Sequence, residues 1–192
     1  MRVVGWLWFL GWALAQAATP TGGPRFEPNR GQSGWGVTFV GRIGSQRIAF
    51  GAASVAIGNL RFRFRNANPG AAIAGEDLLS SRSFYYSGND PALWQKDIPN
   101  YARLRYRDLY PGIDCVFYGG ASGEGALEYD LIVAPHADPE QVLLEIEGVD
   151  NLALTLQGDL QIRAGGCWCS AGRECFRRDA KSPAAIASTE CA

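Results

Sequence analysis

Residues Ser83 to Glu140 read SFYYSGNDPALWQKDIPNYARLRYRDLYPGIDCVFYGGASGEGALEYDLIVAPHADPE, a stretch of alternating aromatic, apolar and charged residues between sharply marked turns. The alternation is clearest from Tyr101 to Asp108. In an extended strand Ala102, Leu104 and Tyr106 fall on one face and three arginines fall on the other. A proline-glycine turn follows this segment. The stretch therefore predicts β-strands joined by tight turns.

The same pattern continues on both sides of this stretch. Leu60 to Arg65, LRFRFR, alternates apolar and arginine residues, so its apolar side chains are expected in a core and its arginines in water. Ile113–Tyr118 and Ala126–Val133 flank a glycine-rich loop and are expected to pair antiparallel. Leu152–Leu156 and Leu160–Arg163 suggest a second hairpin. Helical periodicity is almost absent, so we predict an all-β fold, a single antiparallel β-sandwich-like domain with short turns and little helix.

Three local features refine this prediction. Short separate strands are expected near Ala72–Gly75 and Ser83–Ser87. A loop around Trp94 should follow, and Pro99 is expected to close it. At Asp138-Pro139 an N-cap residue precedes a proline at the first helical position, which predicts a single helical turn.

The two ends of the chain differ from this central domain. Arg2 precedes an apolar run and the small residues Ala15 and Ala17, a pattern typical of a secretory signal peptide, with residues 1–17 removed by cleavage after Ala17. We therefore expect a secreted or cell-surface protein with no membrane span after signal cleavage. The β-domain is predicted over residues 18–165. Residues 166–192 are expected to form a poorly ordered cysteine-rich tail, which we hypothesise to arise from a truncated or frame-shifted reading frame.

The tail contains four cysteines, for which disulfides are the default in an exported protein. Three connectivities are possible, and the spacing differs from that of the usual zinc knuckle. These residues are Cys167, Cys169, Cys175 and Cys191, while Cys115 is expected to be a buried small hydrophobe.

Charge and motif content exclude several classes of function. The formal net charge is −1, without the basic excess typical of nucleic-acid-binding proteins. His136 stands alone in a proline-rich turn, so it is expected to be solvated and completes no catalytic triad. The loop Gly119–Gly125 lacks the lysine and hydroxyl of a phosphate-binding loop. No metal site or cofactor is predicted, because the loop carboxylates lack the D-x-D-x-D spacing of a calcium loop.

Two sets of candidate site residues remain. Asp114, Glu128 and Asp130 lie on expected neighbouring strands and could supply the paired acids of a glycosidase, although alternation places them on an ordinary outer sheet face. Ligand-binding candidates are the loop residue Trp94, which is expected to be exposed, with Tyr110, Arg103 and Arg105. The arginine rows could bind an acidic polysaccharide. Cross-strand pairing is favoured instead, with Glu128 and Asp130 as the expected partners of the row that contains Arg103 and Arg105.

Ordered motifs give the chain a family resemblance. From Phe26 to Arg163 it resembles the N-terminal domain of secreted bacterial proteins that carry SBBP-type beta-propeller repeats. The motifs are FEPNRGQ (26–32), SGNDPALW (87–94), YARLRYRDLYPGIDCVFYG (101–119), LEYDLIVAPHADPEQ (127–141) and GDLQI (158–162). The resemblance implies a secreted, mainly β module placed ahead of repeat domains, and members often have glycine at the position of His136. It supplies no catalytic residues.

The resemblance and the residues together favour a non-enzymatic role. We expect a secreted or cell-surface β module with a structural or interaction function, whose partners are neighbouring repeat domains, surface proteins or polysaccharide. The alternative is a carbohydrate-binding or carbohydrate-hydrolysing module. It would use an aromatic groove and the Asp/Glu group.

Overall fold

The computed structural model describes residues 24–43, 46–119, 127–154, 156, 160–164, 167–171 and 184–188. Strands dominate, and the described helical segments are two single 3-10 turns, η1 (Pro91–Leu93) and η2 (Pro139–Gln141). The strands are β1 (Arg25–Pro28), β2 (Phe39–Ile43), β3 (Gln46–Gly51), β4 (Ser54–Ile57), β5 (Leu60–Arg65), β6 (Ala72–Tyr85), β7 (Gln95–Tyr110), β8 (Ile113–Gly119), β9 (Leu127–Val133), β10 (Leu143–Glu147), β11 (Asn151–Leu154), β12 (Leu160–Ala164), β13 (Cys167–Ala171) and β14 (Ala184–Ser188).

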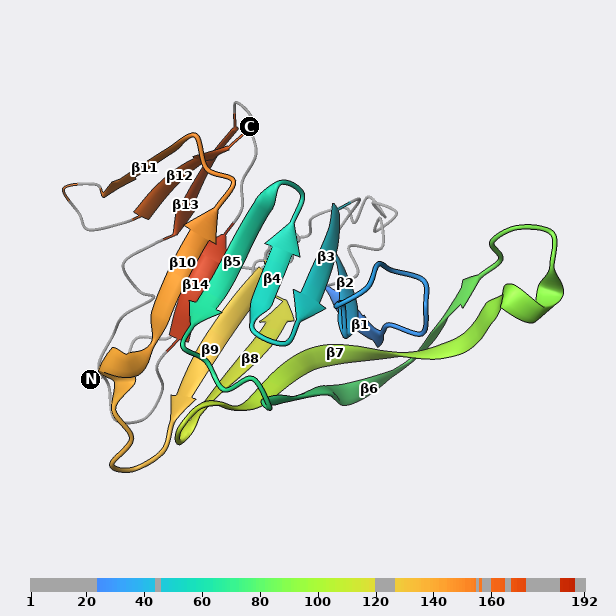
Figure 1. Ribbon diagram of the computed structural model, residues 1–192, viewed down its shortest axis with the longest axis horizontal. Coiled ribbons are helices and arrows are strands. Elements are labelled where there is room, and N and C mark those ends of the chain that lie inside the picture. The colour runs from blue at the N-terminus through green and yellow to red at the C-terminus, as the bar shows by residue number, and fades with distance from the viewer. Residues whose placement is uncertain are drawn as a thin grey trace, which may run out of the picture.

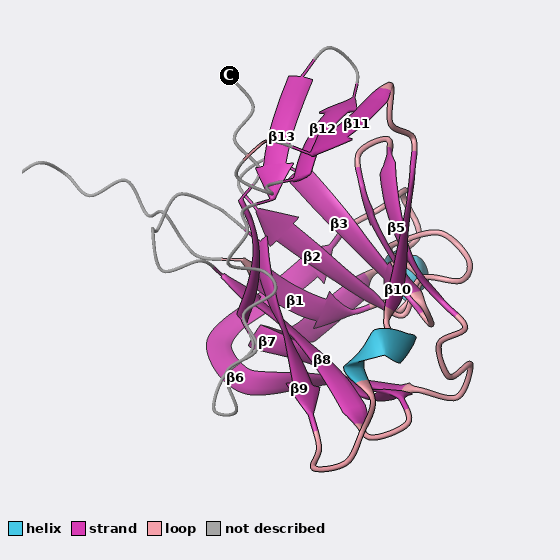
Figure 2. Ribbon diagram, turned by 90° about the vertical axis from the view of Figure 1, so that its left-hand side faces the viewer, coloured by secondary structure: helices cyan, strands magenta, loops and turns pink. Residues whose placement is uncertain are grey.

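The strands form one antiparallel sheet that curls on itself (Figures 1 and 2). Its order is β10-β5-β4-β3-β2-β1-β7-β8-β9-β14-β13-β12-β11, and β6 pairs with β7 off this path. The prediction of an all-β antiparallel domain is confirmed. The sandwich-like arrangement comes from two limbs of one curled sheet, since side chains of β3 and β5 meet those of β7 and β8 across the interior.

The core lies between these two limbs. Phe50 on β3 meets Phe117 on β8 edge to face, with ring centroids 5.2 Å apart. Phe64 packs on Tyr106 with centroids 6.4 Å apart. Strand alternation explains this core, because Phe64, Leu104 and Tyr106 are the inward residues of the two runs in which arginines point outward. Cys115 is buried in the same cluster, as predicted.

Two buried tyrosines bind the backbone at the ends of distant strands, β3 and β5. The Tyr106 hydroxyl donates to the Gly51 carbonyl oxygen at 2.9 Å. The Tyr110 hydroxyl donates to the Arg65 carbonyl oxygen, also at 2.9 Å. Burial raises the pKa of both phenols, so both remain neutral donors at physiological pH.

The largest departure from the sequence-based prediction is a long two-stranded arm made by β6 and β7, which reaches beyond the rest of the sheet (Figure 1). The two short strands predicted at residues 72–75 and 83–87 are parts of the single strand β6. Pro99 does not close a loop, because β7 runs through it and Pro99 pairs with Arg82. Register shifts beyond Leu78 and at Ser83 are β-bulge irregularities that hide the alternation of the arm in the sequence.

The other predicted hairpins form as expected. β8 pairs with β9 and β11 pairs with β12, both antiparallel. η2 begins at the predicted N-cap, where Asp138 Oδ1 accepts a hydrogen bond from the Glu140 amide at 2.9 Å.

The tail contains two strands that the sequence did not suggest: β13 pairs with β12, and β14 pairs with both β13 and β9. The predicted signal peptide lies outside the described residues, as do Cys175 and Cys191.

Candidate functional site

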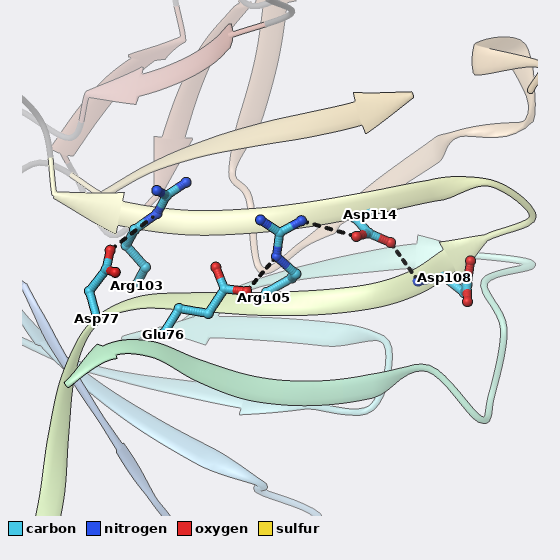
Figure 3. A network of polar contacts seen from close by, with 6 residues as sticks. All are labelled: Glu76, Asp77, Arg103, Arg105, Asp108 and Asp114. Atoms are coloured by element: carbon cyan, nitrogen blue, oxygen red, sulfur yellow. Dashed lines mark hydrogen bonds and ion pairs between the residues drawn. The ribbon is translucent and has the colours of Figure 1, made fainter. Parts of the chain in front are cut away.

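Arg105 is the centre of a polar network on the outer face of β6, β7 and β8 (Figure 3). Its Nε lies 2.7 Å from Glu76 Oε1, and its Nη1 lies 3.1 Å from Asp114 Oδ2. Asp114 also accepts the Asp108 amide hydrogen at 2.8 Å through Oδ1. The hydrogen bond to Glu76 is the main reason that the pKa of Arg105 is raised, and the bond to Asp114 adds to it. Arg105 and Asp114 therefore satisfy each other rather than facing an open site.

The other two candidate acids lie on β9. Val116 is directly opposite Asp130, and Tyr118 is opposite Glu128. The Tyr118 hydroxyl donates to Asp130 Oδ1 at 2.9 Å, and the guanidinium of Arg103 lies over the Tyr118 ring, 5.9 Å from its centroid. Burial and the bond to Asp130 raise the pKa of Tyr118. Partial burial raises the pKa of Glu128, and the charge of Asp130 adds to this effect.

The three acids are therefore neighbours on one sheet face, each in a different environment. Asp114 lies opposite Ile132, so it is a diagonal neighbour of Asp130, at a separation of about 7–8 Å. Among the described hydrogen bonds, Asp114 and Asp130 each accept from a donor, whereas none involves the side chain of Glu128, whose pKa is raised as that of a potential acid would be. Within the described part of the chain, no three His, Cys, Asp or Glu side chains are grouped as metal ligands.

The outward arginines pair across strands, but not with the expected partners. Arg63 Nε lies 2.8 Å from Glu147 Oε1, and Arg65 Nη1 lies 3.4 Å from Glu145 Oε2, both on β10. Arg103 approaches Asp77 at 3.9 Å. The interpretation of Glu128 and Asp130 as partners of the Arg103 and Arg105 row is therefore corrected. Glu76 and Asp77 of β6 and Asp114 of β8 take that place, because β6 runs beside β7 along most of its length.

The ligand-binding candidates Trp94 and Tyr110 lie in different environments. Tyr110 is 1% exposed and its hydroxyl is bonded to backbone, so no ligand can reach it in this fold. Trp94 lies at the far end of the arm and is half-buried rather than fully exposed. Its Nε1 donates to the Gly88 carbonyl oxygen at 3.2 Å, and Lys96 Nζ lies 5.2 Å from its ring centroid.

The exposed aromatic side chains of the arm are Phe84 and Tyr86, for which the sequence favoured core or corner positions over a sugar-stacking role. Their rings are nearly parallel, at 11°, with centroids 6.4 Å apart. Trp94 meets Tyr86 edge to face, with centroids 5.1 Å apart. We refer to Phe84, Tyr86 and Trp94 as the arm cluster.

A second group that sequence reasoning missed lies under the opposite face of the arm. Glu27 is 3% exposed and accepts a short hydrogen bond from the Tyr85 hydroxyl. Gln32 Nε2 also donates to Glu27, at 3.4 Å. Burial is the first reason that the pKa of Tyr85 is raised, and the bond to Glu27 is the second.

Asn100 completes this anchor. It is 1% exposed, accepts from Ser83 Oγ at 3.1 Å and donates to Ser81 Oγ at 3.2 Å. The FEPNRGQ motif could have indicated that Glu27 is buried, because it places this glutamate between a buried phenylalanine and a proline in an expected β domain. Such a carboxylate needs donors if it is buried.

His136 is an exposed turn residue, as predicted, and its φ of 69° lies in the left-handed region. Glycine adopts this conformation most easily, which agrees with the glycine that the resemblance implies there. Among the described hydrogen bonds and ion pairs, none joins His136 to a candidate acid.

A cavity of about 50 Å³ lies inside the curled sheet. It is bounded by apolar and aromatic side chains of β4, β5, β8, β9 and β10, namely Val55, Ile57, Phe62, Phe64, Phe117, Leu127, Tyr129 and Leu144. None of the candidate acids borders it. Its lining offers no converging polar groups for catalysis.

Comparison with known proteins identifies a family for most of the sheet. No curated protein and no solved structure matches the chain. Among the described residues, no helix has the length and apolar character required to cross a membrane. A family model with the description Domain of unknown function (DUF7948) matches residues 52–166, from β4 to the end of β12 and beyond. The chain belongs to this family of domains of unknown function.

Proposed function

We propose that the chain is a non-enzymatic β module with a structural or interaction role at the cell exterior, and that the arm provides its contact surface. The signal-peptide pattern of residues 1–17 supports export. The resemblance to modules that precede beta-propeller repeats supports a role in presentation rather than in chemistry.

One observation carries the non-enzymatic part of this proposal: Asp114 and Asp130 are already bound by neighbouring side chains. Asp114 accepts from Arg105 and from the Asp108 amide, and Asp130 accepts from Tyr118. These acids lie on a sheet face and not at the cavity. A glycosidase instead needs two carboxyl groups that flank a bound sugar, roughly 5–10 Å apart and free to react.

A hydrolase is the second candidate, and Glu128 is the observation that favours it. A carboxyl group with a raised pKa beside a second carboxyl group is the arrangement of a general acid and its partner. Asp130 is the next outward residue on the same strand, but its bond to Tyr118 holds the carboxylate on the sheet.

A hydrolysis screen separates these candidates. The exported protein is incubated with soluble polysaccharides, and the length of the polysaccharide is followed by size-exclusion chromatography. We expect no shortening by the wild type. Shortening that disappears in Glu128→Gln but persists in the surface control Glu145→Gln would establish the hydrolase and reject our first candidate. Sequencing of the exported N-terminus tests export independently, with Ala18 expected as the first residue.

A further inference from the structure

The arm presents two chemically different faces. Tyr85 points to the buried Glu27, and Ser83 points to the buried Asn100. Phe84 and Tyr86, the residues on either side of Tyr85, have exposed fractions of 50% and 61%, so their rings lie away from this buried anchor. The anchored face holds the strand in place. The opposite face keeps its aromatic rings in solvent.

The exposed rings are ordered before any ligand arrives. Phe84 and Tyr86 lie nearly parallel, and Trp94 packs against Tyr86 at right angles. Trp94 is itself fixed by its hydrogen bond to Gly88 and covered by Lys96. Ordered rings lose little conformational entropy on binding, which favours recognition by a small contact area.

We propose that Phe84 and Tyr86 bind a neutral polysaccharide by stacking against its sugar rings, with Trp94 as the positioning residue for Tyr86. This inference rests on the proposed non-enzymatic contact function of the arm. The electron-rich face of an aromatic ring attracts the C–H groups on the apolar face of a sugar. Phe84 and Tyr86 are neighbouring rings with centroids 6.4 Å apart and are 50% and 61% exposed, so their accessible ring surfaces can contact one sugar chain together.

The size of the surface favours a sugar chain over a protein. Aromatic side chains bury about 150–250 Å² each, so two that are roughly half exposed offer about 200 Å². A stable protein interface buries about 800 Å² on each partner. The exposed Leu78 and Leu93 of the arm add to the apolar surface but leave it well below that area.

The charges near the rings favour a neutral ligand. Arg82 is paired with Asp97 at 3.3 Å, and Lys96 covers Trp94. Asp90 uses Oδ1 to cap η1. A single lysine among these acids lacks the row of cations that phosphate-rich or uronic polymers require.

The experiment is affinity electrophoresis of the exported protein in gels that contain β-glucan, xylan, mannan, soluble chitin oligomers or, as the acidic comparison, polygalacturonate. We expect retardation by at least one neutral polymer and none by polygalacturonate. Phe84→Ala and Tyr86→Ala should each weaken binding at least about fivefold, by analogy with the loss of one stacked base. Both side chains are exposed, so the variants should fold. The matched control is Trp35→Ala, which removes a fully exposed tryptophan from another loop.

Trp94 has its own test. Trp94→Ala should weaken binding, and Trp94→Phe should largely restore it, because an aromatic ring again packs against Tyr86. An equal loss in both variants would reject this positioning role.

The remaining outcomes separate this inference from the function proposed above. A polymer that is bound intact, and no longer bound by Tyr86→Ala, supports both. A shortened polymer rejects the non-enzymatic function. Absence of retardation by every neutral polymer overturns the sugar-binding inference while leaving that function standing. Retardation only by polygalacturonate, equal retardation of all variants, or a dimer that Tyr86→Ala dissolves also overturns the inference.

Discussion

Arg105 on β7 and Asp114 on β8 are joined by an ion pair with 3.1 Å between Nη1 and Oδ2, and Glu76 on β6 holds the same guanidinium from the other side. One arginine thus connects three adjacent strands. Its side chain is 22% exposed, so water screens these contacts less than it screens the pairs at the β5–β10 edge.

Replacing Arg105 with alanine should lower the free energy of unfolding by about 1–3 kcal/mol, because Glu76 and Asp114 lose a shared charged donor. Urea unfolding measures the change. The control is Arg65→Ala, which removes a more exposed pair and should cost less than about 1 kcal/mol. Equal effects of the two substitutions would mean that the network contributes no more than an ordinary surface pair.

Removing the Tyr106 hydroxyl should also destabilise the fold. Tyr106→Phe keeps the ring in the core but takes the donor from the Gly51 carbonyl oxygen, 55 residues away in sequence. A buried group left without its partner costs about 1–3 kcal/mol. The expected result is a lower urea midpoint with an unchanged slope. An unchanged midpoint would contradict this role of the hydroxyl.

The anchor beneath the arm predicts a local effect. Tyr85→Phe leaves the buried Glu27 without its closest donor, so β6 should open more often near residues 81–85. Hydrogen exchange followed by mass spectrometry should show that Tyr85→Phe speeds exchange in the arm relative to the wild type, and does so more there than in β8 and β9. Tyr86→Phe changes the neighbouring residue on the opposite face and should leave exchange unaltered. Uniformly faster exchange across the domain would instead indicate a global loss of stability.

The sequence predicted the strands in which alternation is uninterrupted. Leu60–Arg65 and the arginine-rich half of β7 have clear inward and outward residues, and the structure buries the expected faces. It did not predict the arm, because Pro99 and two register shifts break the period of two. Left-handed residues Asp77 and Asp97 lie within the arm strands, where a sequence pattern would suggest turns.

In the candidate site, alternation predicted which face each side chain lies on but not its partners. Alternation placed the acids and arginines on the outer face, but the pairing partners depend on strand order, which brought β6 beside β7. Glu27 was missed because charged residues are normally exposed, and its contacts with Tyr85 and Gln32, which compensate its burial, appear only in the structure. Trp94 drew attention as a loop tryptophan, whereas spatial packing makes it a support for Tyr86.

Glu128 should make the stability of the domain depend on pH in a definite direction. Its folded-state pKa is raised, first by burial and then by Asp130, so the folded protein binds a proton at this site more tightly than the unfolded chain. The wild type therefore loses stability as the pH rises from the unfolded glutamate value of about 4.3 through the folded pKa.

The Glu128→Gln variant lacks this loss of stability. It should be more stable than the wild type at pH 7, and this advantage should shrink towards pH 4. Urea unfolding at both pH values measures the difference. Glu145→Gln, which breaks the surface pair with Arg65, should give no such gain. A Glu128→Gln variant that is less stable than the wild type at pH 7 would show that the carboxylate makes a favourable contact that outweighs its burial.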